Sequence, residues 1–130
     1  MKKIFLDANV LIDFIDANRN KHKKAVEFIK NNVGNFFYTS CDILTTIYYI
    51  ASKNKCENVL EKLEYVLKLV KIINFSNELA LKTIESMKIN KNFKDFEGAL
   101  QYELAKSIKA DFIVTNDKNF YSPDIKIIAL

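Results

Sequence analysis

The stretch "KKIFLDANVLIDF", residues 2 to 14, is strongly apolar but carries a carboxylate in its middle. Seven of the eleven residues from Ile4 to Phe14 are large apolar side chains. Asp7 separates a short apolar run, typical of a buried strand, from a second run with helical spacing. Because a buried carboxylate is costly without a partner, Asp7 indicates a helix cap, an ion pair or a metal ligand.

The composition favours one globular domain spanning residues 1–130. Hydrophobic residues make up 49% of the 130-residue chain and charged residues 28%, which is typical of a single folded domain. No apolar run approaches the roughly 18 residues of a membrane span, so we expect a cytoplasmic protein with no membrane contact. Two cysteines and one histidine, with no CxxC, exclude a disulfide framework and a Cys/His zinc site. The net charge of +4 mildly favours an anionic partner such as nucleic acid.

Strands and helices alternate along the chain. Short apolar runs predict strands over residues 3–6, 36–39, 70–75, 112–115 and 126–128. Between them, apolar residues with helical spacing predict helices over residues 9–17, 22–33, 43–51, 59–70, 76–87 and 96–108. This alternation predicts an α/β fold with a parallel sheet that helices cover on both faces.

Three aspartates are expected at the carboxyl edge of that sheet. Asp7 closes the first strand, Asp117 follows the strand over residues 112–115, and Asp95 begins the helix leading into that strand. This edge is where open α/β sheets bind ligands. Carboxylates that meet there repel one another unless a cation lies between them, and hard oxygen ligands suit Mg²⁺ or Mn²⁺. Metal-bound water at such a site predicts phosphodiester hydrolysis.

Three segments resemble the PIN-domain family in order and separation. They are "FLDANVLIDF", "SCDILTTIYYI" and "DFEGALQYELAKSIKADFIVTNDKNF", and the resemblance spans essentially the whole chain. It implies a three-layer α/β/α fold around a mostly parallel sheet of four or five strands. It also implies an Mg²⁺- or Mn²⁺-dependent endoribonuclease acting on RNA. Many small bacterial members are VapC-type toxins of toxin–antitoxin pairs, so the resemblance implies an antitoxin protein as partner and a homodimer.

The resemblance also assigns roles to individual positions. Asp7 and Asp117 match the first and last acids of the family. The second and third motifs depart from it, because Thr46 stands where a glutamate is usual and Gly98 where a further aspartate is usual. Asp95 precedes Gly98 by one helical turn and could serve as ligand in place of the carboxylate that is missing at position 98. The expected catalytic residues and metal ligands are therefore Asp7, Asp95 and Asp117, with Asn9, Thr46, Thr115 and Glu97 in supporting roles.

Other interpretations of these residues remain open. The departures at Thr46 and Gly98 allow a catalytically weakened PIN fold that binds RNA or protein without cleaving it. Asp7 and Asp95 could act as helix caps alone, and Asp13 and Asp16 are expected to be exposed on the first helix. The basic residues Arg19 and Lys21 to Lys24 could contact RNA phosphates or form a solvated helix face.

Two unrelated functions are disfavoured. A phosphoacceptor receiver domain needs an aspartate at the end of its third strand, and "VKIINFS" has none. A dinucleotide-binding domain needs a glycine-rich turn, which is also missing.

Overall fold

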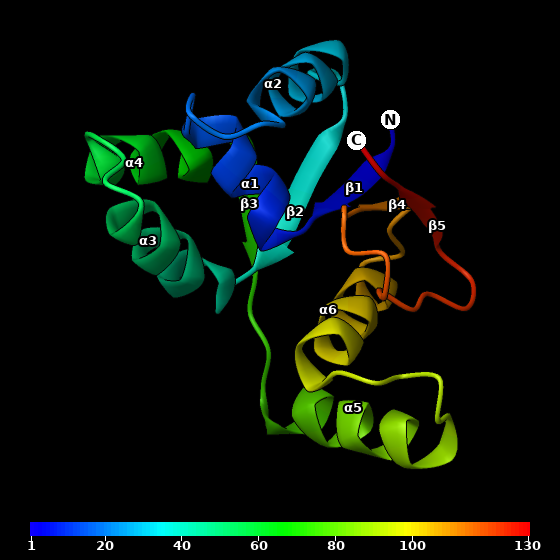
Figure 1. Cartoon of the computed structure of the whole chain (residues 1–130). Coiled ribbons are helices and arrows are strands. Elements are labelled where there is room, and N and C mark those ends of the chain that lie inside the picture. Colours follow the sequence, from blue (N-terminus) through cyan, green and yellow to red (C-terminus); the bar gives the residue numbers. More distant parts are fainter.

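A computed structural model describes residues 1–130 and has a five-stranded parallel sheet at its centre (Figure 1). The strands are β1 (Lys3–Leu6), β2 (Phe36–Ser40), β3 (Val70–Ile73), β4 (Phe112–Val114) and β5 (Lys126–Ile128). They lie in the order β3-β2-β1-β4-β5, and every neighbouring pair is parallel. The predicted parallel sheet is therefore confirmed, with five strands.

Six helices cover the two faces of the sheet. They are α1 (Ala8–Ile15), α2 (His22–Asn31), α3 (Ile43–Lys53), α4 (Val59–Leu69), α5 (Asn77–Ile89) and α6 (Phe96–Ser107). Figure 1 shows α1 to α4 gathered on one side and α5 and α6 on the other. This is the expected three-layer α/β/α arrangement. The longest helix, α5, has 13 residues, and none of the six is long and apolar enough to cross a membrane.

The strand order creates a switch point beside the central strand. The chain moves outward from β1 through β2 to β3, then returns to the other edge of β1 with β4. Ligands of open α/β sheets bind where the strand order reverses, outside the carboxyl ends of the strands. The fold therefore places a crevice between the ends of β1 and β4.

The hydrophobic core lies between β1, β4 and the innermost helices. Ile4, Phe5 and Leu6 of β1 are at most 1% exposed. In α6 the burial extends well beyond the expected inner face, because every residue from Ala99 to Ala105 is buried. The reason is that α5 packs over the outer side of α6, where the Ser86 hydroxyl donates to Oε1 of Glu103 at 3.0 Å.

Candidate active site

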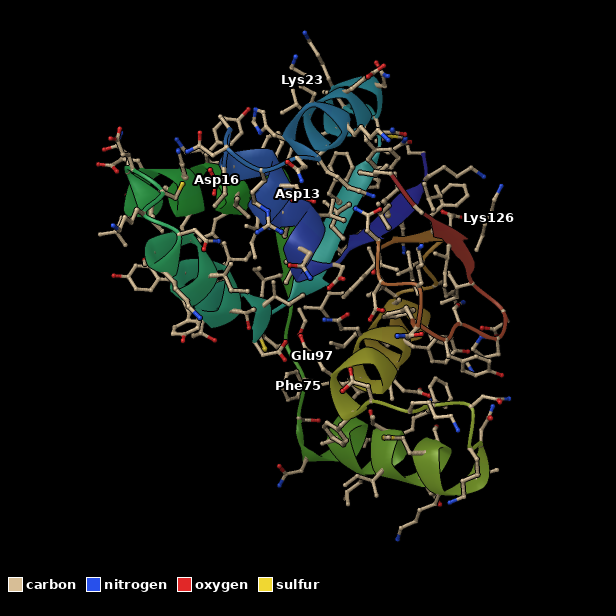
Figure 2. The ribbon with its side chains drawn as sticks, in the orientation of Figure 1. Asp13, Asp16, Lys23, Phe75, Glu97 and Lys126 are labelled. Atoms are coloured by element: carbon tan, nitrogen blue, oxygen red, sulfur yellow. The ribbon has the colours of Figure 1, made fainter.

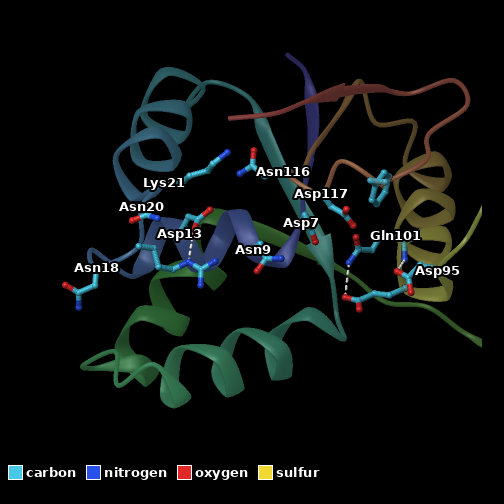
Figure 3. A pocket seen from close by; sticks show the side chains of 14 residues that line it. Asp7, Asn9, Asp13, Asn18, Asn20, Lys21, Asp95, Gln101, Asn116 and Asp117 are labelled. Carbon is cyan, nitrogen blue, oxygen red and sulfur yellow. Dashed lines mark hydrogen bonds and ion pairs between the residues drawn. The ribbon is translucent and has the colours of Figure 1, made fainter.

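A polar cavity of about 790 Å³ lies at the carboxyl ends of β1 and β4 (Figure 3). Fourteen residues line it, and Phe120 is the only hydrophobic one. Five of the lining residues are acidic, namely Asp7, Asp13, Asp95, Glu97 and Asp117. The three predicted ligands therefore reach the same cavity.

The Asp7 carboxylate has a structural role in capping α1 and also lines the cavity. Its backbone N–H donates to the Val114 carbonyl at 3.1 Å, so β1 stays paired with β4 up to this residue. Its side-chain Oδ1 accepts from the Ala8 N–H at 2.7 Å, as an N-cap of α1. Its Oδ2 accepts from the Thr115 hydroxyl at 2.9 Å. The carboxylate thus caps the helix and still lines the cavity, so the two interpretations of Asp7 are compatible.

Thr115 also orients the turn that carries Asp117. The Thr115 Oγ1 accepts from the Asp117 backbone N–H at 3.1 Å, while Oδ1 of Asp117 accepts from the Asn119 N–H at 2.9 Å. Thr115 is buried and Asp117 is exposed. One buried hydroxyl therefore links the carboxylate at the end of β1 to the acidic turn after β4.

Burial sets the protonation behaviour of Asp7. Loss of hydration raises the pKa of Asp7 above its ordinary value, and the nearby Asp117 carboxylate raises it further. The hydrogen bonds from Thr115 and Ala8 oppose that rise. A cation beside this carboxylate would remove the same electrostatic penalty.

The first turn of α6 supplies the opposite wall of the site. Asp95 is the N-cap of this helix, and its Oδ2 accepts from the Gly98 N–H at 3.0 Å. Glu97 accepts from the Gln101 side-chain amide at 3.4 Å (Figure 3). Partial loss of hydration raises the pKa of Glu97, as do the charges of Asp7, Asp42 and Asp95. The wall thus offers two carboxylates, one of which lies in the field of Asp7.

Gly98 leaves a gap between these groups. A Cβ at this position would lie 3.5 Å from Oδ2 of Asp95 and 3.8 Å from Phe120, which is ordinary van der Waals contact. The backbone of Gly98 has no positive φ. A side chain therefore fits where the PIN family usually has an aspartate.

The donor set fits a hydrated divalent cation better than a tightly enclosed one. No three His, Cys, Asp or Glu side chains lie close enough together to hold one ion directly. Asp7, Asp95 and Asp117 share the cavity without forming one coordination sphere. Because Mg²⁺ binds through one or two carboxylates and keeps several waters, this spacing is compatible with such an ion.

The remaining supporting residues lie in different places. Asn9, in the first turn of α1, lines the cavity, whereas Thr46, half-buried on α3, does not. Asp42 precedes α3 and accepts a hydrogen bond from the Ser40 hydroxyl. Thr46 thus lies on α3 outside the lining of this cavity.

The expectation that Asp13 and Asp16 are exposed is wrong, because they are 6% and 3% exposed. The segment after α1 folds back over the end of that helix and covers them. Asp13 Oδ1 accepts from Nε of Arg19 at 2.6 Å, and Asp16 Oδ1 accepts from the Asn18 N–H at 3.1 Å. Both carboxylates are buried because the following turn supplies their partners.

Several residues of the cavity were not singled out by the sequence. Asn18, Asn20, Gln101 and Asn116 line it. Amide side chains are common in loops and carry no spacing signal of their own. Asp13 and Arg19 have opposite charges six residues apart, but helical periodicity does not predict a contact across the end of a helix.

Comparisons with known proteins agree with this architecture. The sequence matches the family model of the PIN domain over residues 4–126. It is 42% identical over 129 residues to Ribonuclease VapC1 of Aquifex aeolicus (strain VF5), covering 98% of this chain and 90% of that protein.

Solved structures with the same fold are more distant in sequence. VapBC2 from Rickettsia felis, bound to a DNA fragment from its promoter, gives a TM-score of 0.70 with 22% identity and 98% coverage of both chains. Mycobacterium tuberculosis VapC20, described as a sarcin–ricin loop cleaving toxin, gives a TM-score of 0.70 with 13% identity, covering 85% of this chain and 86% of that one. These two structures are similar to this chain in fold. The match to the family model and the 42% identity to Ribonuclease VapC1 are similarities in sequence, and they show that this chain belongs to the PIN-domain family.

Proposed function

We propose that this protein is a divalent-metal-dependent endoribonuclease and the toxin of a toxin–antitoxin pair. The observation that carries the proposal is the polar cavity at the ends of β1 and β4, which Asp7, Asp95, Glu97 and Asp117 line together. The 42% identity to Ribonuclease VapC1 supports the reaction class. Similarity to VapBC2, a toxin–antitoxin complex, supports an antitoxin partner. We expect it to act in the cytoplasm, where RNA is available, and to form a homodimer.

The chemistry assigns roles to the residues of the two walls. Asp7 and Asp117 would hold Mg²⁺ or Mn²⁺, and Asp95, at the start of α6, would contact the ion through one of its waters. Such an ion supplies an activated water and neutralises charge on the phosphate. Thr115 keeps the Asp7 carboxylate aimed at the cavity through its 2.9 Å hydrogen bond. Asn9 lies beside these carboxylates as a further polar contact for the substrate.

The position of the Glu97 carboxylate supports a role as general base. It lines the same cavity as Asp7 and Asp117, and a carboxylate within reach of an attacking water can accept its proton. The Gln101 amide, which is buried, donates to this carboxylate and orients it. We therefore assign Glu97 the role of accepting the proton of the attacking water.

A second candidate function is binding without cleavage. Gly98 removes one carboxylate of the family pattern, and no three acidic side chains are close enough to ligate an ion directly. A PIN fold with a weakened site would still present the cavity to RNA or to a protein. This alternative predicts RNA binding that is independent of divalent metal.

The deciding experiment is cleavage of a mixed single-stranded RNA pool with Mn²⁺ or Mg²⁺, compared with EDTA. We expect metal-dependent cutting by the wild type and loss of at least about a hundredfold in Asp7→Asn. Glu61→Gln is the matched control, because Glu61 is exposed on α4 and away from the cavity. Equal silence of wild type and Asp7→Asn, with no Mn²⁺ site tighter than millimolar by calorimetry, would instead favour the binding function.

A further inference from the structure

The wall of the cavity that faces α6 is formed by the segment between α1 and α2. Asn18, Arg19, Asn20 and Lys21 line the cavity from this segment. Figure 3 shows Asn18, Asn20 and Lys21 across from Asp95 and Gln101. One wall of the cavity is therefore acidic, whereas the other carries two cations and the Asp13 carboxylate, which is paired with Arg19.

Lys21 and Arg19 differ in whether their N–H groups already have hydrogen-bond partners within the protein. The Lys21 ammonium donates to the carbonyl oxygen of Leu130 at 2.7 Å, so it already has a partner within the chain. Arg19 uses only Nε, which donates to Asp13 at 2.6 Å, and its two terminal nitrogens make no hydrogen bond within the protein. Arg19 thus presents the free edge of its guanidinium to the cavity.

Asp13 holds that guanidinium in a fixed place. Its side chain is 8% exposed, against 27% for Arg19, so the pair lies at the boundary between the protein interior and the cavity. The backbone around it is fixed as well, since the Arg19 N–H donates to the Asp16 carbonyl and the His22 N–H to the Arg19 carbonyl, each at 3.1 Å. An arginine held in this way loses little conformational entropy when it binds a ligand.

We infer that Arg19, positioned by Asp13, binds a backbone phosphate of the RNA strand in this cavity. This inference rests on the proposed nuclease function for the identity of the ligand. Two adjacent N–H groups on a planar guanidinium match two phosphate oxygens, and arginine is favoured for such contacts. The acidic wall repels a phosphodiester unless a metal ion is present, so the cationic wall supplies the metal-independent part of binding.

The test measures binding separately from cleavage. Fluorescein-labelled single-stranded RNA of mixed sequence is titrated in EDTA, and anisotropy is followed between 50 and 200 mM KCl. Loss of one phosphate contact on single-stranded nucleic acid reduces the slope of log K against log salt by about 0.7. We expect Arg19→Gln to bind about tenfold more weakly and to show this reduced slope.

Three further variants distinguish a phosphate contact from a structural effect. Arg19→Lys keeps the charge and should keep the salt slope while losing a few-fold in affinity. Asp13→Asn should weaken binding, and its combination with Arg19→Gln should be no weaker than Arg19→Gln alone. Lys23→Gln is the matched control, because Lys23 points outward from α2 and does not line the cavity (Figure 2). It should bind as the wild type does.

The outcomes separate this inference from the proposed function. If Arg19→Gln binds RNA with the affinity and salt slope of the wild type, the inference is wrong whether or not the wild type cleaves. A wild type that binds RNA, loses the contact in Arg19→Gln and never cleaves with Mn²⁺ would support the inference and remove the nuclease function. A wild type that neither binds nor cleaves RNA would overturn both.

Discussion

Thr115 donates its hydroxyl hydrogen bond to Oδ2 of Asp7 at 2.9 Å, although 108 positions separate the two residues in the chain. Both are buried, and they lie at the ends of two strands that pair in the middle of the sheet. The same hydroxyl accepts from the backbone of Asp117. Thr115 is therefore the point at which the first and last acidic motifs are connected.

Replacing Thr115 by valine tests this connection. The substitution keeps the shape of the side chain but leaves Oδ2 of Asp7 without its buried donor. We expect the free energy of unfolding to fall by about 1–3 kcal/mol, the cost of an unsatisfied buried group. Urea unfolding at pH 7 measures it, with Thr115→Ser, which keeps the hydroxyl, as control. Equal stability of Thr115→Val and Thr115→Ser would contradict the assigned role.

The raised pKa of Asp7 predicts a pH dependence of stability in EDTA. Its folded pKa lies above the ordinary value of 3.8, so between these two values the folded state binds more protons than the unfolded state. The contribution of Asp7 to the free energy of unfolding therefore falls as pH rises through that window. We expect Asp7→Asn to gain stability relative to the wild type across the same window, by about 1.4 kcal/mol per unit of elevation.

Unfolding by urea at pH values from 4 to 8 measures this difference. Above the folded pKa the stability difference between the two proteins should be constant. If the difference in free energy of unfolding between wild type and Asp7→Asn stays the same from pH 4 to 8, burial of the ionised Asp7 carboxylate does not destabilise the folded state.

Gly98 offers a gain-of-function prediction. The space beside Asp95 accepts a Cβ without a clash, and an acidic residue in the first turn of a helix is favourable. We expect Gly98→Asp to bind Mn²⁺ at least about fivefold more tightly, because it adds a carboxylate to the acidic wall. Calorimetry measures the affinity. Gly98→Asn, of equal size and uncharged, should bind Mn²⁺ as the wild type does, and an equal gain in both variants would rule out a ligand effect.

Thr46 provides the converse prediction. It occupies the position at which the family usually has an acid, yet it does not line the cavity. We expect Thr46→Ala to change the rate of RNA cleavage by less than about twofold, since a threonine on a helix commonly bonds its own backbone. A steady-state cleavage assay with Mn²⁺ measures it. A loss comparable to that of Asp7→Asn would give Thr46 a catalytic role.

Local sequence patterns predicted the fold well, but they did not predict the cavity wall formed by the segment between α1 and α2. Asp7 could be predicted because it interrupts a strongly apolar run at the point where a strand passes into a helix. The parallel sheet followed from buried strands alternating with amphipathic helices. Asp95 and Asp117 were predicted from their positions at the start of a helix and after a strand, and the family motifs gave the same residues. Each of these signals lies within a few consecutive residues.

Asp13, Arg19 and Gln101 give no such signal. Asp13 was expected to be exposed because it lies on a surface helix, and its burial depends on how the chain folds back after Ile15. Gln101 is buried because it lies on the side of α6 that faces the cavity, beside Glu97. Such contacts depend on tertiary packing, which no local periodicity encodes.

The pairing of β1 with β4 also constrains when activity can begin. The contact between Asp7 and Thr115 joins residues 108 positions apart in the chain. During synthesis the ribosome releases the first strand long before the fourth, and the two cannot pair until both have emerged. The Asp7 carboxylate therefore gains its buried hydrogen-bond donor only after β4 has paired with β1. A folding intermediate in which β4 has not yet joined the sheet lacks one side of the acidic cavity, so the site is completed late in folding.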